Sequence, residues 1–153
     1  MAYFPLWHKT FAAAAEESDA AVFTKTDLGT LPEWNLADLY PSMDSPELAQ
    51  DLARTEREAR AFEEMWKGRL AEEAGKGGSG RLGEAVRAYE GLDELFGRIG
   101  SYAGLIYAGD TSDPKRAKFY GDVQERLTDA STHLLFFTLE MNKIDDALIE
   151  AAF

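Results

Sequence analysis

The stretch LGEAVRAYEGLDELFGRIGSYAGLIYA, residues 82–108, decides the fold class, because its apolar residues recur at alternating intervals of three and four. That alternation places them along one stripe of an α-helix. We therefore expect a long helix over about residues 81–108 with one buried face. The stripe consists of Leu82, Ala85, Tyr89, Leu92, Phe96, Ile99, Ala103 and Ile106.

Similar stripes on either side predict two further long helices. One starts at Ser45, a favourable N-cap that is followed by Pro46 at the first helical position, and is expected to end near Ala74. The other starts in the same way at Asp113-Pro114. The inward positions are Leu48, Leu52, Thr55, Ala59, Phe62, Trp66 and Arg69–Leu70 in the first of these, and Ala117, Tyr120, Val123, Leu127, Ala130, Leu134, Phe137, Met141 and Ile144 in the second.

Short connections join these three segments. Residues 75–80 contain four glycines and are expected to form a flexible loop, and residues 109–112 form the next turn. Helices joined by short connections are antiparallel neighbours. We expect an all-α chain in which residues 31–153 form an antiparallel bundle of three long helices, with a short C-terminal helix after Asp145-Asp146. Residues 1–30 show no sustained periodicity and are expected to form an irregular or partly disordered N-terminal arm.

Glycine is unusually frequent within the predicted central helix. Gly97, Gly100 and Gly104 lie at helical spacing, and each costs about 1 kcal/mol relative to Ala in a helix interior. We expect these glycines to let another backbone approach closely. The alternative is a bend in the helix.

Composition excludes several functional classes. The formal net charge is −12, from 28 acidic and 16 basic residues, so neither nucleic acid nor an anionic membrane surface is an expected partner. The absence of cysteine removes disulfides, thiol nucleophiles and Cys-based zinc sites. The first 22 residues have neither the basic n-region of a signal peptide nor the acid-poor composition of a transit peptide. We expect a soluble, cytoplasmic protein.

Residues 134–139, Leu-Leu-Phe-Phe-Thr-Leu, are apolar on every side of the predicted helix. A helical segment of this kind is a buried one, and two partner helices are too few to surround it. The helical pattern of residues 147–153 also continues to the last residue. We therefore expect the sequence to be a piece of a longer chain, and the isolated piece to self-associate.

Four segments, in order, are similar to those of PepF-type oligoendopeptidases, a family of zinc metallopeptidases. Residues 32–40, Pro-Glu-Trp-Asn-Leu-Ala-Asp-Leu-Tyr, resemble the opening "W-(D/N)-L-x-D-L-Y" of that family, and residues 99–114 resemble its "SYA…DTxDP" stretch. Residues 134–140 resemble its "LLFF-x-LE" segment, and Ile144-Asp145-Asp146 its hydrophobic-Asp-Asp continuation. The resemblance covers about residues 31–153.

This resemblance implies a mainly helical peptidase that cleaves short peptides inside a deep channel. Zinc would be held by two His of a His-Glu-x-x-His helix and a downstream Glu, with the motif's Glu as general base. The helices seen here would form one wall of the channel, and the zinc site would lie in a missing catalytic domain. The expected partners are that remainder of the chain and, for the intact enzyme, short peptides.

The chain itself offers no residue for the chemistry of that family. Its two histidines, His8 and His133, are followed by Lys9 and Leu134, so neither opens a His-Glu-x-x-His motif. We assign no catalytic, cofactor-binding or metal-binding residue, and expect the chain alone to be inactive and to hold no cofactor. A stand-alone helical interaction module that uses the surface of residues 134–139 is the alternative function.

Three sets of side chains could form sites, but the sequence favours a structural role for each. His133 lies four residues after Asp129 and could pair with it, but a metal site would need further ligands. The acidic doublets at 16–17, 63–64, 72–73 and 145–146 point in different directions on a helix, which favours solvated surface or capping. The third set is expected to pack in the core or at its boundary rather than to line a peptide groove: Tyr89, Tyr102, Tyr107 and Tyr120.

Overall fold

A computed structural model describes residues 34–153, and every regular element in this part of the chain is helical. The expected all-α class is therefore confirmed for these residues, whereas the expected N-terminal arm at residues 1–30 lies outside them. The helices are α1 (Pro46–Trp66), α2 (Leu70–Gly75), α3 (Leu82–Gly109), α4 (Pro114–Ser131), α5 (Leu135–Met141) and α6 (Asp146–Ala152), with two short 3-10 helices, η1 (Gly77–Ser79) and η2 (Thr132–Leu134).

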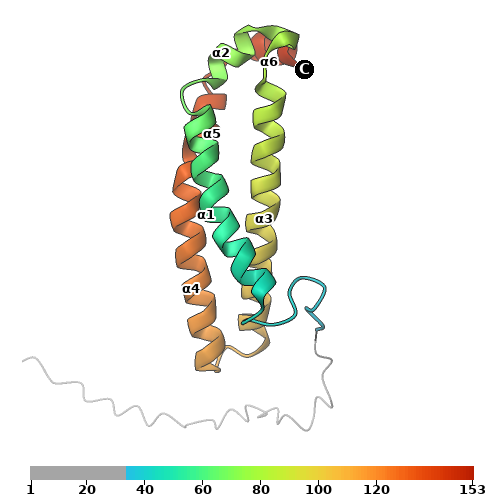
Figure 1. Ribbon diagram of the computed structural model, residues 1–153, viewed down its shortest axis with the longest axis vertical. Helices are drawn as coiled ribbons and strands as arrows, with labels where there is room; N and C mark the ends of the chain where they lie inside the picture. The colour runs from blue at the N-terminus through green and yellow to red at the C-terminus, as the bar shows by residue number, and fades with distance from the viewer. Residues whose placement is uncertain (1–33) are drawn as a thin grey trace, which may run out of the picture. The chain divides into compact units, whose positions relative to one another are not determined.

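The three longest helices, α1, α3 and α4, each pack against the other two. Figure 1 shows α1 and α4 running in one direction and α3 in the opposite direction. The short elements α2, η1, α5 and α6 gather at one end of the three helices, where α2 contacts both α5 and α6. None of the helices in residues 34–153 has the length and apolar character needed to cross a bilayer.

Helix α1 forms as the sequence predicts. Ser45 caps its first turn, since its side-chain oxygen accepts a hydrogen bond of 3.3 Å from the Leu48 amide, and Pro46 needs no partner at the first helical position. The predicted inward residues up to Trp66 are all buried, as is Leu70 beyond the end of α1, whereas Arg69 is exposed. The buried residues of α1 are Leu48, Leu52, Thr55, Ala59, Phe62 and Trp66.

The first helix ends earlier than the expected Ala74. It stops at Trp66, and a turn at residues 67–69 separates it from α2. Gly68 in this turn has a φ of +78°, a left-handed conformation that side-chain-bearing residues rarely adopt. The Glu140 carboxylate, 72 residues away, accepts hydrogen bonds of 2.8 and 3.0 Å from the Gly68 amide. A contact between residues far apart in the chain therefore stabilises the turn between α1 and α2.

The third predicted helix is also interrupted, at η2 between α4 and α5. Just before and within this interruption, the hydroxyls of Ser131 and Thr132 donate hydrogen bonds of 2.8 and 2.7 Å to the carbonyls of Thr128 and Asp129. Such bonds offer the backbone an alternative to regular helix geometry. Of the predicted inward residues in this helix, Ala117, in the first turn of α4, is exposed.

The buried side chains form two apolar clusters. The first lies toward the end that carries α2, α5 and α6 and includes Phe62, Trp66, Leu82, Phe136 and Phe137. The second lies between α1, α3 and α4 farther along and includes Tyr40, Leu52, Ile99, Tyr102 and Leu127. Phe96 of α3 packs against both clusters, so the apolar interior is continuous.

The expected close approach of a second backbone to the glycines of α3 is wrong for the described residues. A Cβ atom added at Gly97 or Gly104 would meet nothing within 4 Å, and one added at Gly100 would meet only the Leu127 side chain, at 3.6 Å. Gly97 and Gly104 therefore face open space, whereas Gly100 lies beside the Leu127 side chain of α4. The cost of Gly97 and Gly104 in helix stability is not offset by packing within residues 34–153.

Replacing Gly97 with Ala should therefore raise the free energy of unfolding by about 1 kcal/mol, because Ala is the better helix former and has room here.

Replacing Gly68 with Ala should lower the free energy of unfolding by about 1 kcal/mol, because φ at Gly68 is positive. Urea denaturation followed by circular dichroism measures both variants. A loss of stability in Gly97→Ala would contradict the open space seen beside α3.

Candidate functional site

Tyr40, the last residue of the first resemblance segment, is held in a polar and aromatic cluster. Its hydroxyl donates a 2.8 Å hydrogen bond to Oδ2 of Asp51 on α1. The guanidinium of Arg98 on α3 lies over the Tyr40 ring, 4.7 Å from the centroid, and donates a 2.8 Å hydrogen bond to the Leu39 carbonyl. The cluster thus joins the segment that precedes α1 to two long helices.

The same tyrosine links the first resemblance segment to the second. The rings of Tyr40 and Tyr102 meet edge to face with centroids 5.2 Å apart, and both side chains are buried. Burial raises the pKa of Tyr40 well above its usual range, and the hydrogen bond to Asp51 adds to this effect. Burial also raises the pKa of Tyr102, with a further contribution from the Asp44 carboxylate. Folding therefore favours the neutral form of both phenols.

Removing the hydroxyl in Tyr40→Phe should lower the free energy of unfolding by about 2 kcal/mol at pH 7, because one hydrogen bond to a carboxylate is lost. Because the pKa of Tyr40 is raised by folding, the wild-type chain should lose stability as the pH rises above the ordinary tyrosine pKa of about 10. Urea unfolding at pH 7 and pH 11 measures both effects. If the free energy of unfolding of Tyr40→Phe fell equally steeply between pH 7 and pH 11, the stabilising role of the Tyr40 hydroxyl would be contradicted.

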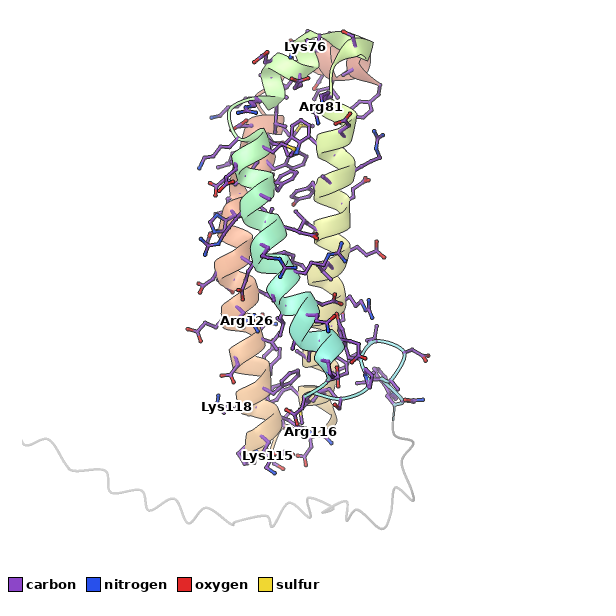
Figure 2. All side chains as sticks on the ribbon, in the orientation of Figure 1. Lys76, Arg81, Lys115, Arg116, Lys118 and Arg126 are labelled. Atoms are coloured by element: carbon purple, nitrogen blue, oxygen red, sulfur yellow. The ribbon has the colours of Figure 1, made fainter. Side chains whose placement is uncertain are left out.

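His133 lies where α4 gives way to η2, and its partner differs from the one suggested by the sequence. Its Nδ1 atom lies 2.5 Å from Oε2 of Glu63 on α1, rather than being paired with Asp129 on its own helix. Seven residues earlier in both helices, the Arg126 guanidinium is paired with Glu56 at 2.7 Å (Figure 2). From one pair to the other, both partners move seven residues in the same direction along the chain, as expected for two helices that run parallel. Sequence alone contained no signal for these pairs, because each joins residues 70 positions apart.

The acidic doublets in the described residues serve ion pairs and helix ends. Glu63 binds Lys67 at 2.6 Å as well as His133. Glu72 and Glu73 both bind Lys76, and the Asp145 side chain caps α6 by accepting a 2.9 Å hydrogen bond from the Ala147 amide. The structural interpretation of these three doublets is confirmed, and the doublet at 16–17 lies outside the described residues.

The four tyrosines weighed as groove residues pack against apolar or aromatic neighbours. Tyr89 stacks on Phe137 with ring centroids 4.3 Å apart, and Tyr107 stacks on Tyr120 at 5.1 Å. Tyr102 is buried in the second cluster. Within residues 34–153, Tyr102 is a core residue and the other three tyrosines lie at the boundary of the core.

Residues 134–139 divide into buried and exposed positions. Phe136 and Phe137 are buried in the first cluster, and Leu134 is partly covered. Leu135 and Leu139, four residues apart on the outer face of α5, are 63% and 62% exposed. We expected the apolar side chains of residues 134–139 to remain partly uncovered by the other helices. Only Leu135 and Leu139 are exposed in this way.

Two shallow hollows lie between α1 and α4. One is mainly apolar and is lined by residues that include Leu48, Leu52, Phe119 and Val123. The other, beside the paired His133, is polar and is lined by Glu56, Arg60, Arg126, Asp129, Ala130 and His133.

No group of three or more His, Asp or Glu side chains in residues 34–153 is arranged to hold a metal ion. His8, the second histidine, lies outside the described residues. No protein-family model, curated protein or solved structure matches the chain.

Proposed function

We propose that this chain is a non-catalytic N-terminal helical domain of a zinc-dependent oligoendopeptidase similar to the PepF type, and that it forms part of the wall of the channel that encloses short peptide substrates. The observation that carries the proposal is the ordered resemblance of four segments over about residues 31–153. The zinc ligands and the general base belong to a catalytic domain outside this sequence.

The roles of the resembling residues support a scaffold function. Tyr40 and Tyr102, from two different segments, pack against each other between α1 and α3. Asp113 caps α4 by accepting a 2.7 Å hydrogen bond from the Lys115 amide. Glu140 holds the turn after α1 through the Gly68 amide. Residues that shape helix junctions suit a domain that encloses a substrate without reacting with it.

The test is the reading frame that follows Phe153. We expect it to encode a His-Glu-x-x-His helix, and the complete product to bind stoichiometric zinc and to cleave a short internally quenched fluorescent peptide. Replacing the motif's Glu with Gln in that product should abolish cleavage while leaving zinc bound, because that Glu is the general base and not a ligand.

The chain of 153 residues alone should show neither stoichiometric zinc by metal analysis nor cleavage of the same peptide. A stop codon directly after Phe153, a downstream frame without the motif, or stoichiometric zinc in the chain alone would each overturn the proposal.

A stand-alone helical interaction module is the second candidate, and it is favoured by the exposure of Leu135 and Leu139 on α5. Adjacent apolar side chains on an exposed helix face are typical of a protein interface. Like the first proposal, this candidate predicts that the isolated chain self-associates at high micromolar concentration, as measured by size exclusion with light scattering, so the reading frame after Phe153 and not the oligomeric state separates the two. The double variant Leu135→Glu, Leu139→Glu should then be monomeric, whereas Ala117→Glu, at an exposed site on α4, should behave as wild type. Wild-type chain that stays monomeric would count against this candidate.

A further inference from the structure

Residues 67–69, between α1 and α2, break a stretch whose sequence predicts one helix. The apolar stripe of α1 continues through the break at intervals of four residues, from Trp66 to Leu70 and Ala74. All three side chains are buried in the first apolar cluster. In Figure 1, however, α2 turns away from the axis of α1. The residue pattern is therefore compatible with a continuous helix, whereas the observed backbone is bent.

The bend lacks the backbone hydrogen bond that commonly ends a helix at a glycine. In such an ending, the amide of the left-handed glycine donates to a backbone carbonyl of the last helical turn. In a continuous helix, the Gly68 amide would donate to the Glu64 carbonyl, four residues earlier. Within residues 34–153, the Gly68 amide donates instead to both oxygens of the Glu140 carboxylate of α5, at 2.8 and 3.0 Å. A side chain from a distant element thus occupies the donor that a continuous helix would need.

The remaining contributions at the bend are modest and nothing blocks the helical alternative. Glycine adopts the left-handed φ of +78° at Gly68 at little cost, and it disfavours a helix interior by roughly fivefold relative to Ala. Both preferences favour the bend, as does the complete burial of Leu70 and Ala74. A Cβ atom added at Gly68 would meet nothing within 4 Å, so the space around the bend is open.

We propose that residues 67–69 are a two-state hinge, which is bent while the Glu140 carboxylate holds the Gly68 amide and which joins α1 and α2 into one helix when this contact is lost. This inference concerns the described residues and does not depend on the proposed peptidase role. In the continuous form, the Gly68 amide passes to the Glu64 carbonyl, so the backbone donor keeps a partner. Helix α2 then leaves its contacts with α5 and α6, and the hinge couples Glu140 to the exposure of these two helices.

Distances between pairs of nitroxide labels, measured by pulsed electron paramagnetic resonance, test the proposal on the full chain. The chain has no cysteine, so only introduced pairs carry labels. Arg57→Cys with Glu72→Cys places labels at two exposed positions on either side of the hinge, 15 residues apart. Asp93→Cys with Ala108→Cys has the same separation between exposed positions of the uninterrupted α3. This second pair is the reference for a continuous helix, in which 15 residues span about 22 Å.

In the wild-type background, the main distance across the hinge should be shorter than the reference distance. Glu140→Ala should raise the ratio of continuous to bent form about tenfold, the lower end of the range for a hydrogen bond to a charged acceptor, because the contact is exposed. Adding Gly68→Ala should raise this ratio further, to on the order of a hundredfold above wild type, because Ala favours the helix and disfavours a positive φ. The reference distance should then become the main one.

Two further variants separate the contact from a general effect of charge. Glu140→Gln keeps a side-chain oxygen that accepts a hydrogen bond from the Gly68 amide, so its distances should lie nearer to wild type than those of Glu140→Ala. Glu94→Ala, which removes an exposed carboxylate from α3, should give the wild-type distances.

Two results would overturn the proposal. If the double variant Glu140→Ala, Gly68→Ala kept the wild-type distance, these residues would not control the bend. If it gave a broad distribution without the reference distance, loss of the contact would unfold α2 rather than join it to α1. Should the Glu140 variants fail to fold, Gly68→Ala alone decides, and a distance distribution identical to wild type would then reject the hinge.

Discussion

Replacing Phe137 with Ala should lower the free energy of unfolding by about 4 kcal/mol, as is typical for removing a buried phenylalanine ring. The Phe137 side chain is 7% exposed. Its ring stacks on Tyr89 of α3 with centroids 4.3 Å apart and meets Phe62 of α1 at 5.6 Å. The substitution therefore removes an aromatic contact between α5 and two long helices and leaves a cavity. Urea denaturation followed by circular dichroism gives the value.

Leu139→Ala is the matched control, because it shortens an apolar side chain two residues away that is 62% exposed. We expect the free energy of unfolding to change by no more than about 0.5 kcal/mol, as at other surface positions. Equal losses for Leu139→Ala and Phe137→Ala would show that the outer face of α5 is covered in solution, and would contradict the division of residues 134–139 seen here.

Replacing Gly80 with Ala should lower the free energy of unfolding by about 3 kcal/mol, at the upper end of the range for introducing a steric clash. A Cβ atom at this position would lie 2.0 Å from the Glu73 carbonyl oxygen and 3.0 Å from the Glu73 carbonyl carbon. Both atoms belong to the backbone at the end of α2, so relief requires the loop between α2 and α3 to move. The same denaturation experiment measures the loss.

Gly78, two residues earlier in the same loop, provides the control. A Cβ atom there would meet nothing within 4 Å, so Gly78→Ala should be nearly neutral, within about 0.5 kcal/mol. The contrast tests whether the four glycines of residues 75–80 act together as a flexible linker or whether one of them has a steric role. A neutral Gly80→Ala would contradict the close packing of this loop on α2.

The helices themselves were predictable because their signals are local. The stripe from Leu48 to Trp66 is entirely buried, as its spacing indicated, and Ser45 and Asp113 cap the helices that they were expected to cap. The two interruptions were not predicted, because the stripes continue through Gly68 and His133 without a change of period. What holds one interruption is Glu140, 72 residues away, and periodicity contains no information about such a contact.

In the candidate site too, the sequence indicated the local features but not the contacts between distant residues. His133 is paired, as the sequence indicated, but its partner is Glu63 of α1 and not Asp129, four residues earlier in the chain. The pair Glu63–Lys67, four residues apart, was predictable and is present, whereas Glu56, equally placed before Arg60, is paired with Arg126 of α4. Local geometry allows pairs four residues apart, but a neighbouring helix can offer a competing partner.

Sequence alone established the helical class, the starting points of the long helices, their buried faces and the four segments that resemble a peptidase family, because each depends on residues close together in the chain. Only the tertiary structure decided where the helices break, which carboxylates contact the breaks, and which glycines face open space. The physical reason is that these features depend on contacts between residues about 70 positions apart, such as Gly68–Glu140 and Glu63–His133. Such contacts form only when the helices pack.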